Sequence, residues 1–128
     1  MRILIIEDER SKFRDLESTL NRILHKPLID RKETAVSGLR AIKDARDANK
    51  DYDVIITDNY MPLCNNSKIE PHAEYILEEL ERLGVTSKII VCSSGEVEDC
   101  DDIDINYEFV LYNPSVVLDD KLRDIIGG

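Results

Sequence analysis

Short apolar runs recur along the chain, and the residues between them place apolar side chains three or four positions apart. Apolar runs bounded by polar residues are typical of strands buried on both faces of a sheet. Spacings of three and four are typical of amphipathic helices. We predict strands over Arg2–Ile6, Leu28–Asp30 (an extension toward Val36 is left open), Asp53–Thr57, Lys88–Ser93 and Phe109–Tyr112.

Helices are predicted between these strands, each with one apolar face. They cover Glu9–Leu24, Ser37–Asn49, Pro71–Leu83 and a last segment that runs from the N-cap Ser115 through Ile126. Pro71 suits a first helical turn, and Gly84 suits the position after a helix end. Alternating strands and helices favour right-handed crossovers and a parallel sheet. The predicted fold is therefore α/β, a flavodoxin-like, doubly wound, five-stranded parallel sheet.

Two segments break the alternation. Leu63–Glu70 is a polar connection that is long for this fold class. Glu96–Glu108 stands where a fourth helix is expected, but its acidic residues cluster and its Asp and Asn residues disfavour a helix interior. We predict an irregular or missing fourth helix there.

Composition narrows the function classes. The 128 residues suit a single domain over residues 1–128, and the net charge of -10 argues against nucleic acid and against an anionic membrane surface. No apolar stretch approaches the roughly 20 residues of a membrane helix. The odd cysteine count, without metal-type spacing, fits a reducing cytoplasm, and Cys92 is predicted to be a core residue.

Acidic residues follow two of the predicted strands. Glu7 and Asp8 come directly after the first strand, and Asp58 comes directly after the third. If these strands are parallel neighbours, the three carboxylates meet at the sheet edge where open α/β folds bind ligands. Carboxylates that close together call for a cation, a shared proton or a phosphoryl ligand.

In this order and spacing, the motifs resemble those of response regulator receiver domains of two-component signalling. The markers are the acidic pair, the stretch from Asp58 to Met61-Pro62, and the hydroxyl of Ser93 at the end of the fourth strand. The resemblance covers the chain from Arg2 to about Ile126.

The resemblance implies a phosphorelay function. Asp58 would accept a phosphoryl group from a histidine kinase or phosphotransfer protein. Mg²⁺ would be bound by Asp8, Asp58 and the backbone carbonyl of Tyr60, with Glu7 holding a metal-bound water. Ser93 would hydrogen-bond a phosphoryl oxygen. Output would pass to a downstream protein partner, and no turnover is expected beyond phosphorylation and dephosphorylation of Asp58 itself.

The chain departs from the family at the end of its fifth strand. A receiver usually has Lys-Pro there, whereas this sequence has Asn113-Pro114, and Asn113 donates hydrogen bonds without bringing a charge. The loss of a cation beside three acids is expected to raise an acidic pKa or to increase dependence on Mg²⁺. Receivers often carry an aromatic switch residue in this strand, and the corresponding residue here is Val110. Of the nearby aromatic residues Phe109 and Tyr112, one is expected in the core.

Of two other functions, the first remains open from the residues and the second is disfavoured. One is a pseudo-receiver that binds a protein without being phosphorylated, which the departures at the fifth strand favour. The other is a metal-dependent phosphohydrolase with Asp58 as nucleophile. Such phosphohydrolases require a second Asp, two residues after the nucleophile, as a general acid and base. Tyr60 occupies that position here and cannot take this role at neutral pH.

Overall fold

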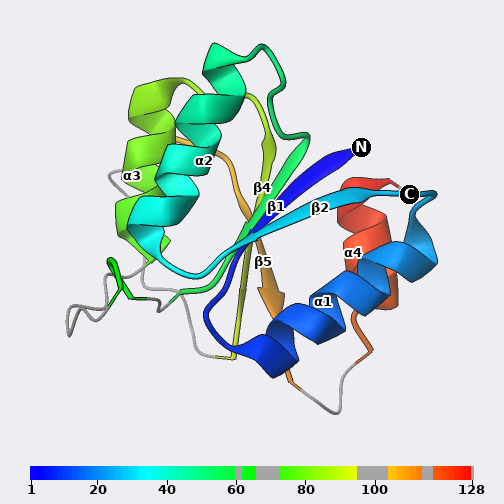
Figure 1. The fold of residues 1–128 in the computed structure, drawn as a ribbon. Coiled ribbons are helices and arrows are strands. Elements are labelled where there is room, and N and C mark those ends of the chain that lie inside the picture. Colours follow the sequence, from blue (N-terminus) through cyan, green and yellow to red (C-terminus); the bar gives the residue numbers. More distant parts are fainter. Residues whose placement is uncertain (60–61, 66–72, 95–103, 114–116, 128) are drawn as a thin grey trace.

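The computed structural model describes residues 1–59, 62–65, 73–94, 104–113 and 117–127, in which strands and helices alternate as predicted. The elements are β1 (Arg2–Ile6), α1 (Arg10–Ile23), β2 (Leu28–Lys32), α2 (Ala35–Asp47), β3 (Val54–Thr57), α3 (Ala73–Leu83), β4 (Lys88–Ser93), β5 (Glu108–Leu111) and α4 (Asp119–Ile126). The strands form one parallel sheet in the order β2-β1-β3-β4-β5 (Figure 1). The predicted flavodoxin-like α/β fold is confirmed.

The register of the sheet brings the carboxyl ends of the strands together. Ile6 of β1 lies opposite both Lys32 of β2 and Thr57 of β3. Thr57 lies opposite Val91 of β4, which in turn lies opposite Phe109 of β5. Polar residues that directly follow these positions therefore share one edge of the sheet.

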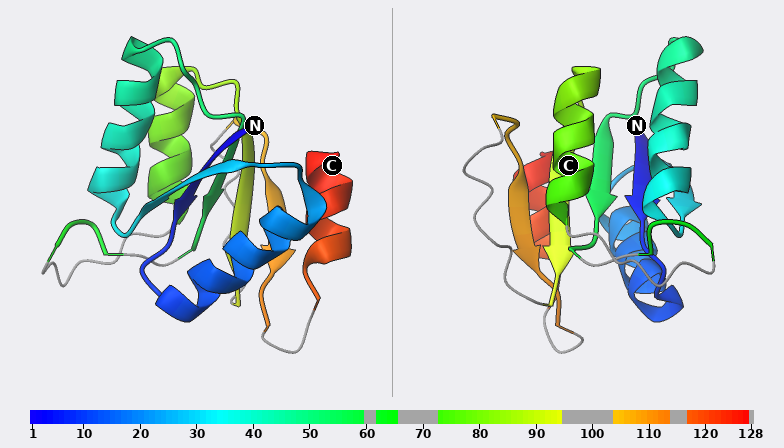
Figure 2. Two further views of the ribbon diagram at one scale, coloured as in Figure 1. Left: turned by 45° about the vertical axis from the view of Figure 1, so that its right-hand side comes forward. Right: turned by 90° about the vertical axis from the view of Figure 1, so that its left-hand side faces the viewer.

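Two apolar layers hold the helices against the sheet, because successive side chains of a strand point to opposite faces. In β1, Leu4 and Ile6 belong to the core shared with α2 and α3, whereas Ile3 and Ile5 belong to the core shared with α1 and α4. All four side chains are fully buried. Figure 2 shows the three layers, with α2 and α3 on one side of the sheet and α1 and α4 on the other. Burial on both faces requires an uninterrupted apolar run, which is why the sequence locates this strand.

The start of α2 lies two residues before the predicted start at Ser37, because Thr34 caps the helix. The Thr34 hydroxyl accepts the Ser37 N–H at 3.1 Å, and the Ser37 hydroxyl accepts the Thr34 N–H at 3.2 Å. The carbonyl group of Pro62 accepts the N–H of Ala35 at 2.9 Å. These bonds satisfy N–H groups that a helix start leaves unpaired, so the helix begins at Ala35.

The strand β2 extends through Lys32, within the extension beyond Asp30 that the sequence left open. It pairs with β1 alone, at the edge of the sheet. Exposure alternates along its five residues. At an edge, polar side chains stay in water while the backbone pairs, so the polar residues from Asp30 onward do not end the strand.

Other element ends agree closely with the prediction. Helix α1 begins at Arg10, one residue later than expected, and Gly84 follows α3 with a φ of +67°, the left-handed conformation typical of a helix end. By contrast, helix α4 begins at Asp119 with Leu118 as its N-cap residue, so the prediction that Ser115 caps this helix is wrong. Within the parts of the chain described above, no helix is both long and apolar enough to cross a lipid bilayer.

Several predictions fall on residues outside the described ranges. They include the first-turn role of Pro71 and most of the polar connection Leu63–Glu70. Residues 95–103 also lie outside, and residues 104–107 have no regular secondary structure. The irregular or missing helix before β5 therefore stays a prediction.

Gly38 marks a close approach between α2 and the sheet. A Cβ atom at this position would lie 2.5 Å from Ile6 Cδ1 and 2.8 Å from Ile6 Cγ1, and Ile6 is fully buried. We expect Gly38→Ala to lower the free energy of unfolding by about 1–2 kcal/mol, because overpacking outweighs the gain in helix propensity. Urea denaturation measures this change.

A double-mutant cycle with Ile6→Val controls for the source of the clash. Ile6→Val removes Cδ1 and should cost about 0.5–1.5 kcal/mol alone. In the Gly38→Ala background it should cost less, because it relieves the contact. Strictly additive effects, or a Gly38→Ala variant more stable than the wild type, would refute this account of the packing.

Candidate functional site

Three carboxylate groups meet at the carboxyl edge of the sheet, as the sequence pattern predicts. Glu7 and Asp8 follow β1, and Asp58 follows the neighbouring strand β3. One carboxylate oxygen of each residue lies within 4.8 Å of the other two. Mg²⁺ prefers oxygen ligands and retains several waters, so this donor set fits the metal that the resemblance implies.

The three carboxylates differ in their contact with solvent. Asp8 is exposed, the Asp58 side chain is 17% exposed, and Glu7 is 1% exposed. Burial raises the pKa of Glu7 to about 7, against the lowering effects of the Lys12 ammonium group and the Glu9 N–H. We expected a raised acidic pKa from a missing cation, but burial is its main cause.

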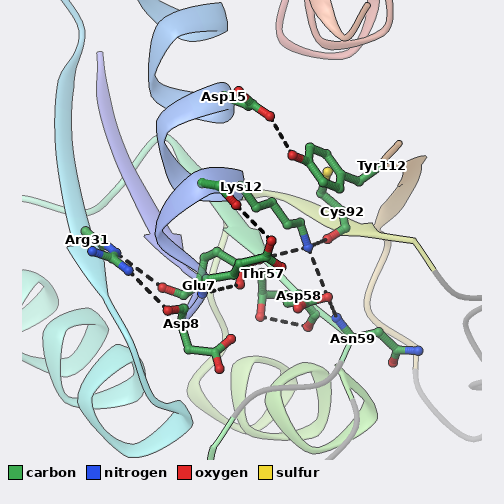
Figure 3. Close-up of polar contacts among 12 residues, drawn as sticks. Glu7, Asp8, Lys12, Asp15, Arg31, Thr57, Asp58, Asn59, Cys92 and Tyr112 are labelled. Atoms are coloured by element: carbon green, nitrogen blue, oxygen red, sulfur yellow. Dashed lines mark hydrogen bonds and ion pairs between the residues drawn. The ribbon is translucent and has the colours of Figure 1, made fainter. Parts of the chain in front are cut away.

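Lys12 extends from the first turn of α1 into this carboxylate cluster (Figure 3). Its Nζ lies 2.8 Å from Glu7 Oε1 and 3.1 Å from Asp58 Oδ1. The same Nζ donates a hydrogen bond of 2.5 Å to the Cys92 carbonyl oxygen and lies 5.4 Å from the centroid of the Tyr112 ring. The contact with Glu7 is an ion pair between two buried side chains.

The Lys12 ammonium group remains charged inside the protein. Only 3% of the residue is exposed. Burial alone would lower its pKa, but the carboxylates of Asp58 and Glu7 raise it above the ordinary value. The carboxylate cluster therefore contains a cation that belongs to the chain itself.

Sequence reasoning missed Lys12, although its position carried a signal. It lies four residues before Leu16 and eight before Leu20, which places it on the buried stripe of α1. A lysine on an inward-facing stripe needs a buried anionic partner. The acids that follow β1 and β3 are such partners, but only the folded structure shows that the side chain reaches them.

Asp58 is held by neighbouring backbone groups. Its Oδ1 accepts the Asn59 N–H at 2.6 Å in addition to the Lys12 contact, and its own N–H reaches the Ile6 carbonyl at 3.3 Å. The Asn59 side chain accepts the N–H of Ala73 at 3.2 Å, at the first residue of α3. Among the described residues, no donor contacts Asp58 Oδ2, so the two oxygens of this carboxylate are not equivalent.

A second cation fixes the backbone of the acidic pair from the outer side (Figure 3). Arg31 of β2 donates to the carbonyl groups of Glu7 and Asp8, both at 3.3 Å. Its guanidinium carbon lies 4.9 Å from the Phe13 ring centroid. It also pairs with Glu33 at 3.3 Å. Arg31 therefore positions the acidic pair through the main chain, whereas Lys12 contacts carboxylate oxygens.

The other predicted site residues lie along the same edge. Ser93 is the last residue of β4 and is 3% exposed, and Asn113 lies two residues beyond β5 and is exposed. Tyr60 and Met61 lie outside the described residues, so the carbonyl ligand predicted at Tyr60 remains untested.

The aromatic residues near β5 divide as predicted, with one of them in the core. Tyr112 is 8% exposed, whereas Phe109 is 39% exposed and Val110 is fully buried. The Tyr112 hydroxyl donates to Asp15 Oδ2 of α1 at 2.5 Å. Burial and this hydrogen bond raise the pKa of Tyr112. Tyr112 therefore links the end of β5 to α1, beside Lys12.

A separate recess of about 690 Å³ lies along β2 and α2. Arg2, Arg40 and Tyr52 are among the residues that line it, and none of the three carboxylates does. The carboxylate cluster is the candidate site, because convergent acidic groups and a buried cation indicate a functional site better than the volume of a recess does.

Comparison with known proteins supports the fold and leaves the sequence family unmatched. No family model matches the chain, and no curated protein does. Solved structures do match. A CheY-like response regulator receiver domain from Methylobacillus flagellatus is 18% identical, with a TM-score of 0.67 and 98% of each chain covered.

Two further matches are structures with a bound metal ion. The response regulator TrrA from Thermotoga maritima, in complex with Mg²⁺-BeF, is 21% identical, with a TM-score of 0.68 and 97% of each chain covered. The Mn²⁺-bound form of the response regulator Rcp1 is 15% identical, with a TM-score of 0.67, covering 98% of this chain and 89% of that one. The resemblance to receiver domains is thus confirmed at the level of the fold.

Proposed function

We propose that the chain is a phosphorelay receiver in which Asp58 accepts a phosphoryl group with Mg²⁺ bound. One observation carries the proposal: the carboxylates of Glu7, Asp8 and Asp58 converge within 4.8 Å at the carboxyl edge of a receiver-like sheet. Asp8 and Asp58 would hold the metal directly, together with the Tyr60 carbonyl, and Glu7 would hold a metal-bound water. When bound, Mg²⁺ would neutralise charge between the carboxylates and the phosphoryl group.

The transfer step uses the carboxylate of Asp58 as nucleophile. A lone pair of Oδ2 forms the new bond to phosphorus, because among the described residues no donor contacts that oxygen. The P–N bond of the phosphohistidine breaks, its electron pair goes to the imidazole nitrogen, and that nitrogen takes up a proton. Hydrolysis later adds water to the acyl phosphate and returns the carboxylate and inorganic phosphate.

The partners follow from this chemistry. The donor is a histidine kinase or a phosphotransfer protein, and the output is a contact with a downstream protein. Ser93 would hydrogen-bond a phosphoryl oxygen at the end of β4, and Asn113 would donate a hydrogen bond from the end of β5. No catalytic turnover is proposed beyond formation and loss of the acyl phosphate.

Beryllofluoride binding tests the proposal. We expect Mg²⁺ with beryllofluoride to shift the amide NMR signals of Glu7, Asp8, Asp58 and Ser93, and a small phosphodonor to add the mass of one phosphoryl group. Asp58→Asn is the matched control, since it keeps the side-chain shape and should abolish both effects. A wild-type protein without shifts and without an adduct would exclude the phosphoacceptor function.

A pseudo-receiver is the second candidate, and Lys12 is the observation that favours it. The Lys12 ammonium group supplies the cluster with a positive charge from the chain itself, at 3.1 Å from the proposed acceptor carboxylate. In that case Lys12 and the carboxylates would be a fixed structural element, and the protein would bind its partner unmodified. Retention of partner binding by Asp58→Asn, together with failure of the adduct test, would identify this function.

A further inference from the structure

We propose that the Lys12 ammonium group, supplied by α1, is the phosphoryl-binding cation of this site and replaces the lysine that receivers usually carry at the end of β5. The inference rests on the proposed function, because it needs a phosphoryl group on Asp58. Lys12 is not one of the motif residues that carry the resemblance to receiver domains. In this assignment, the positive charge that is missing at Asn113 is supplied by Lys12.

Geometry supports the assignment first. The Nζ of Lys12 lies 3.1 Å from Asp58 Oδ1, so it already stands within hydrogen-bond range of the group that would be modified. A phosphoryl group on the other carboxylate oxygen would carry its own oxygens beside this ammonium group. Lys12 reaches Asp58 from the α1 side of the sheet, whereas Asn113 lies exposed beyond β5.

The fixed position of the ammonium group supports it further. Lys12 is 3% exposed and also contacts Glu7 and the Cys92 carbonyl oxygen. A cation held in place before the reaction stabilises developing phosphoryl charge without reorganising. Cys92 directly precedes Ser93, so the Lys12 side chain contacts both Asp58 and the residue before the hydroxyl that is predicted to bind a phosphoryl oxygen.

Arg31, the second cation near the cluster, contacts the main chain of the acidic pair rather than the carboxylate of Asp58. Arg31 donates to main-chain carbonyl groups of Glu7 and Asp8 and pairs with Glu33 on the outer side. Within the described residues, the ion pairs of Asp58 are formed with Lys12. Lys12 is therefore the described cation that a phosphoryl group on Asp58 would meet.

Moving the lysine tests the inference. Affinity for beryllofluoride in the presence of Mg²⁺ is measured by NMR titration for the wild type, Lys12→Met, Lys12→Arg and the double variant Lys12→Met with Asn113→Lys. We expect Lys12→Met to weaken the adduct at least tenfold and Lys12→Arg to retain part of the affinity. Restoring the lysine at position 113 should recover affinity in the double variant. Asn113→Lys alone serves as the control.

A measurement on the wild-type protein tests the inference even if the variants do not fold. A ¹⁹F–¹H Overhauser effect between bound beryllofluoride and the Lys12 side chain is expected in the wild type. If the wild type forms no adduct, the proposed function fails. If it forms the adduct but shows no such contact, or if Lys12→Met binds as tightly as the wild type, the Lys12 inference fails alone.

Discussion

Lys12→Met will lower the free energy of unfolding by about 3–5 kcal/mol at pH 8, because it leaves two carboxylates without their buried partner. Glu7 is 1% exposed and Asp58 keeps 17% of its side chain in solvent, so water can compensate only the second. Mg²⁺ should recover part of the loss by restoring positive charge to the cluster. Urea denaturation with and without Mg²⁺ measures both effects.

The matched control is Lys43→Met, which makes the same change at an exposed position of α2. It should alter stability by no more than about 0.5 kcal/mol. Adding Glu7→Gln to Lys12→Met should recover stability, since it removes one of the two stranded charges. Equal effects at positions 12 and 43 would show that the ion pairs of Lys12 contribute no net stability.

Stability of the wild type will fall between pH 5 and pH 8 by up to about 3 kcal/mol relative to Glu7→Gln. Burial raises the pKa of Glu7 from 4.5 to about 7, so the folded state keeps a proton that the unfolded chain releases. The stabilisation from protonated Glu7 is fully present below pH 4.5 and is lost as the pH rises through about 7. Lys12 stays charged throughout this window.

Urea midpoints of both proteins across this range provide the measurement. Glu7→Gln is neutral at every pH, so subtracting its profile removes the contributions of other titrating groups. The difference should change most between pH 5 and pH 7 and level off above. A flat difference, or one that rises with pH, would contradict a buried Glu7 with a raised pKa.

The strands and the acidic cluster could be predicted from the sequence because their physics is local. An apolar run such as Ile3–Ile6 must be buried on both faces, and the residues after it must lie at the end of a strand. Parallel pairing then brings Glu7 and Asp58 together without further information. The same reasoning predicts a parallel sheet, since alternating strands and helices restrict the crossovers.

The cation in the cluster could not be predicted in this way. The Lys12 side chain reaches from α1 to groups at the ends of several strands, and how deeply a long side chain is buried depends on tertiary packing rather than on sequence spacing. The start of α2 was missed for a related reason, because the capping box of Thr34 and Ser37 competes with an extended reading of the same residues. The sequence shows that Asn113 replaces the usual lysine, but it does not show that α1 supplies another cation to the cluster.

The contacts of the Lys12 side chain should also determine how the carboxyl edge of the sheet unfolds locally. Its side chain begins on α1 and ends among groups that follow β1, β3 and β4. The first turn of α1 cannot lift without hydrating the buried Glu7 carboxylate at the same moment. Amide protons of that turn, such as the Phe13 N–H bonded to the Glu9 carbonyl at 3.0 Å, should exchange with water in the same events as the Asp58 amide. The edge then behaves as one cooperative unit in hydrogen exchange rather than as separate loops.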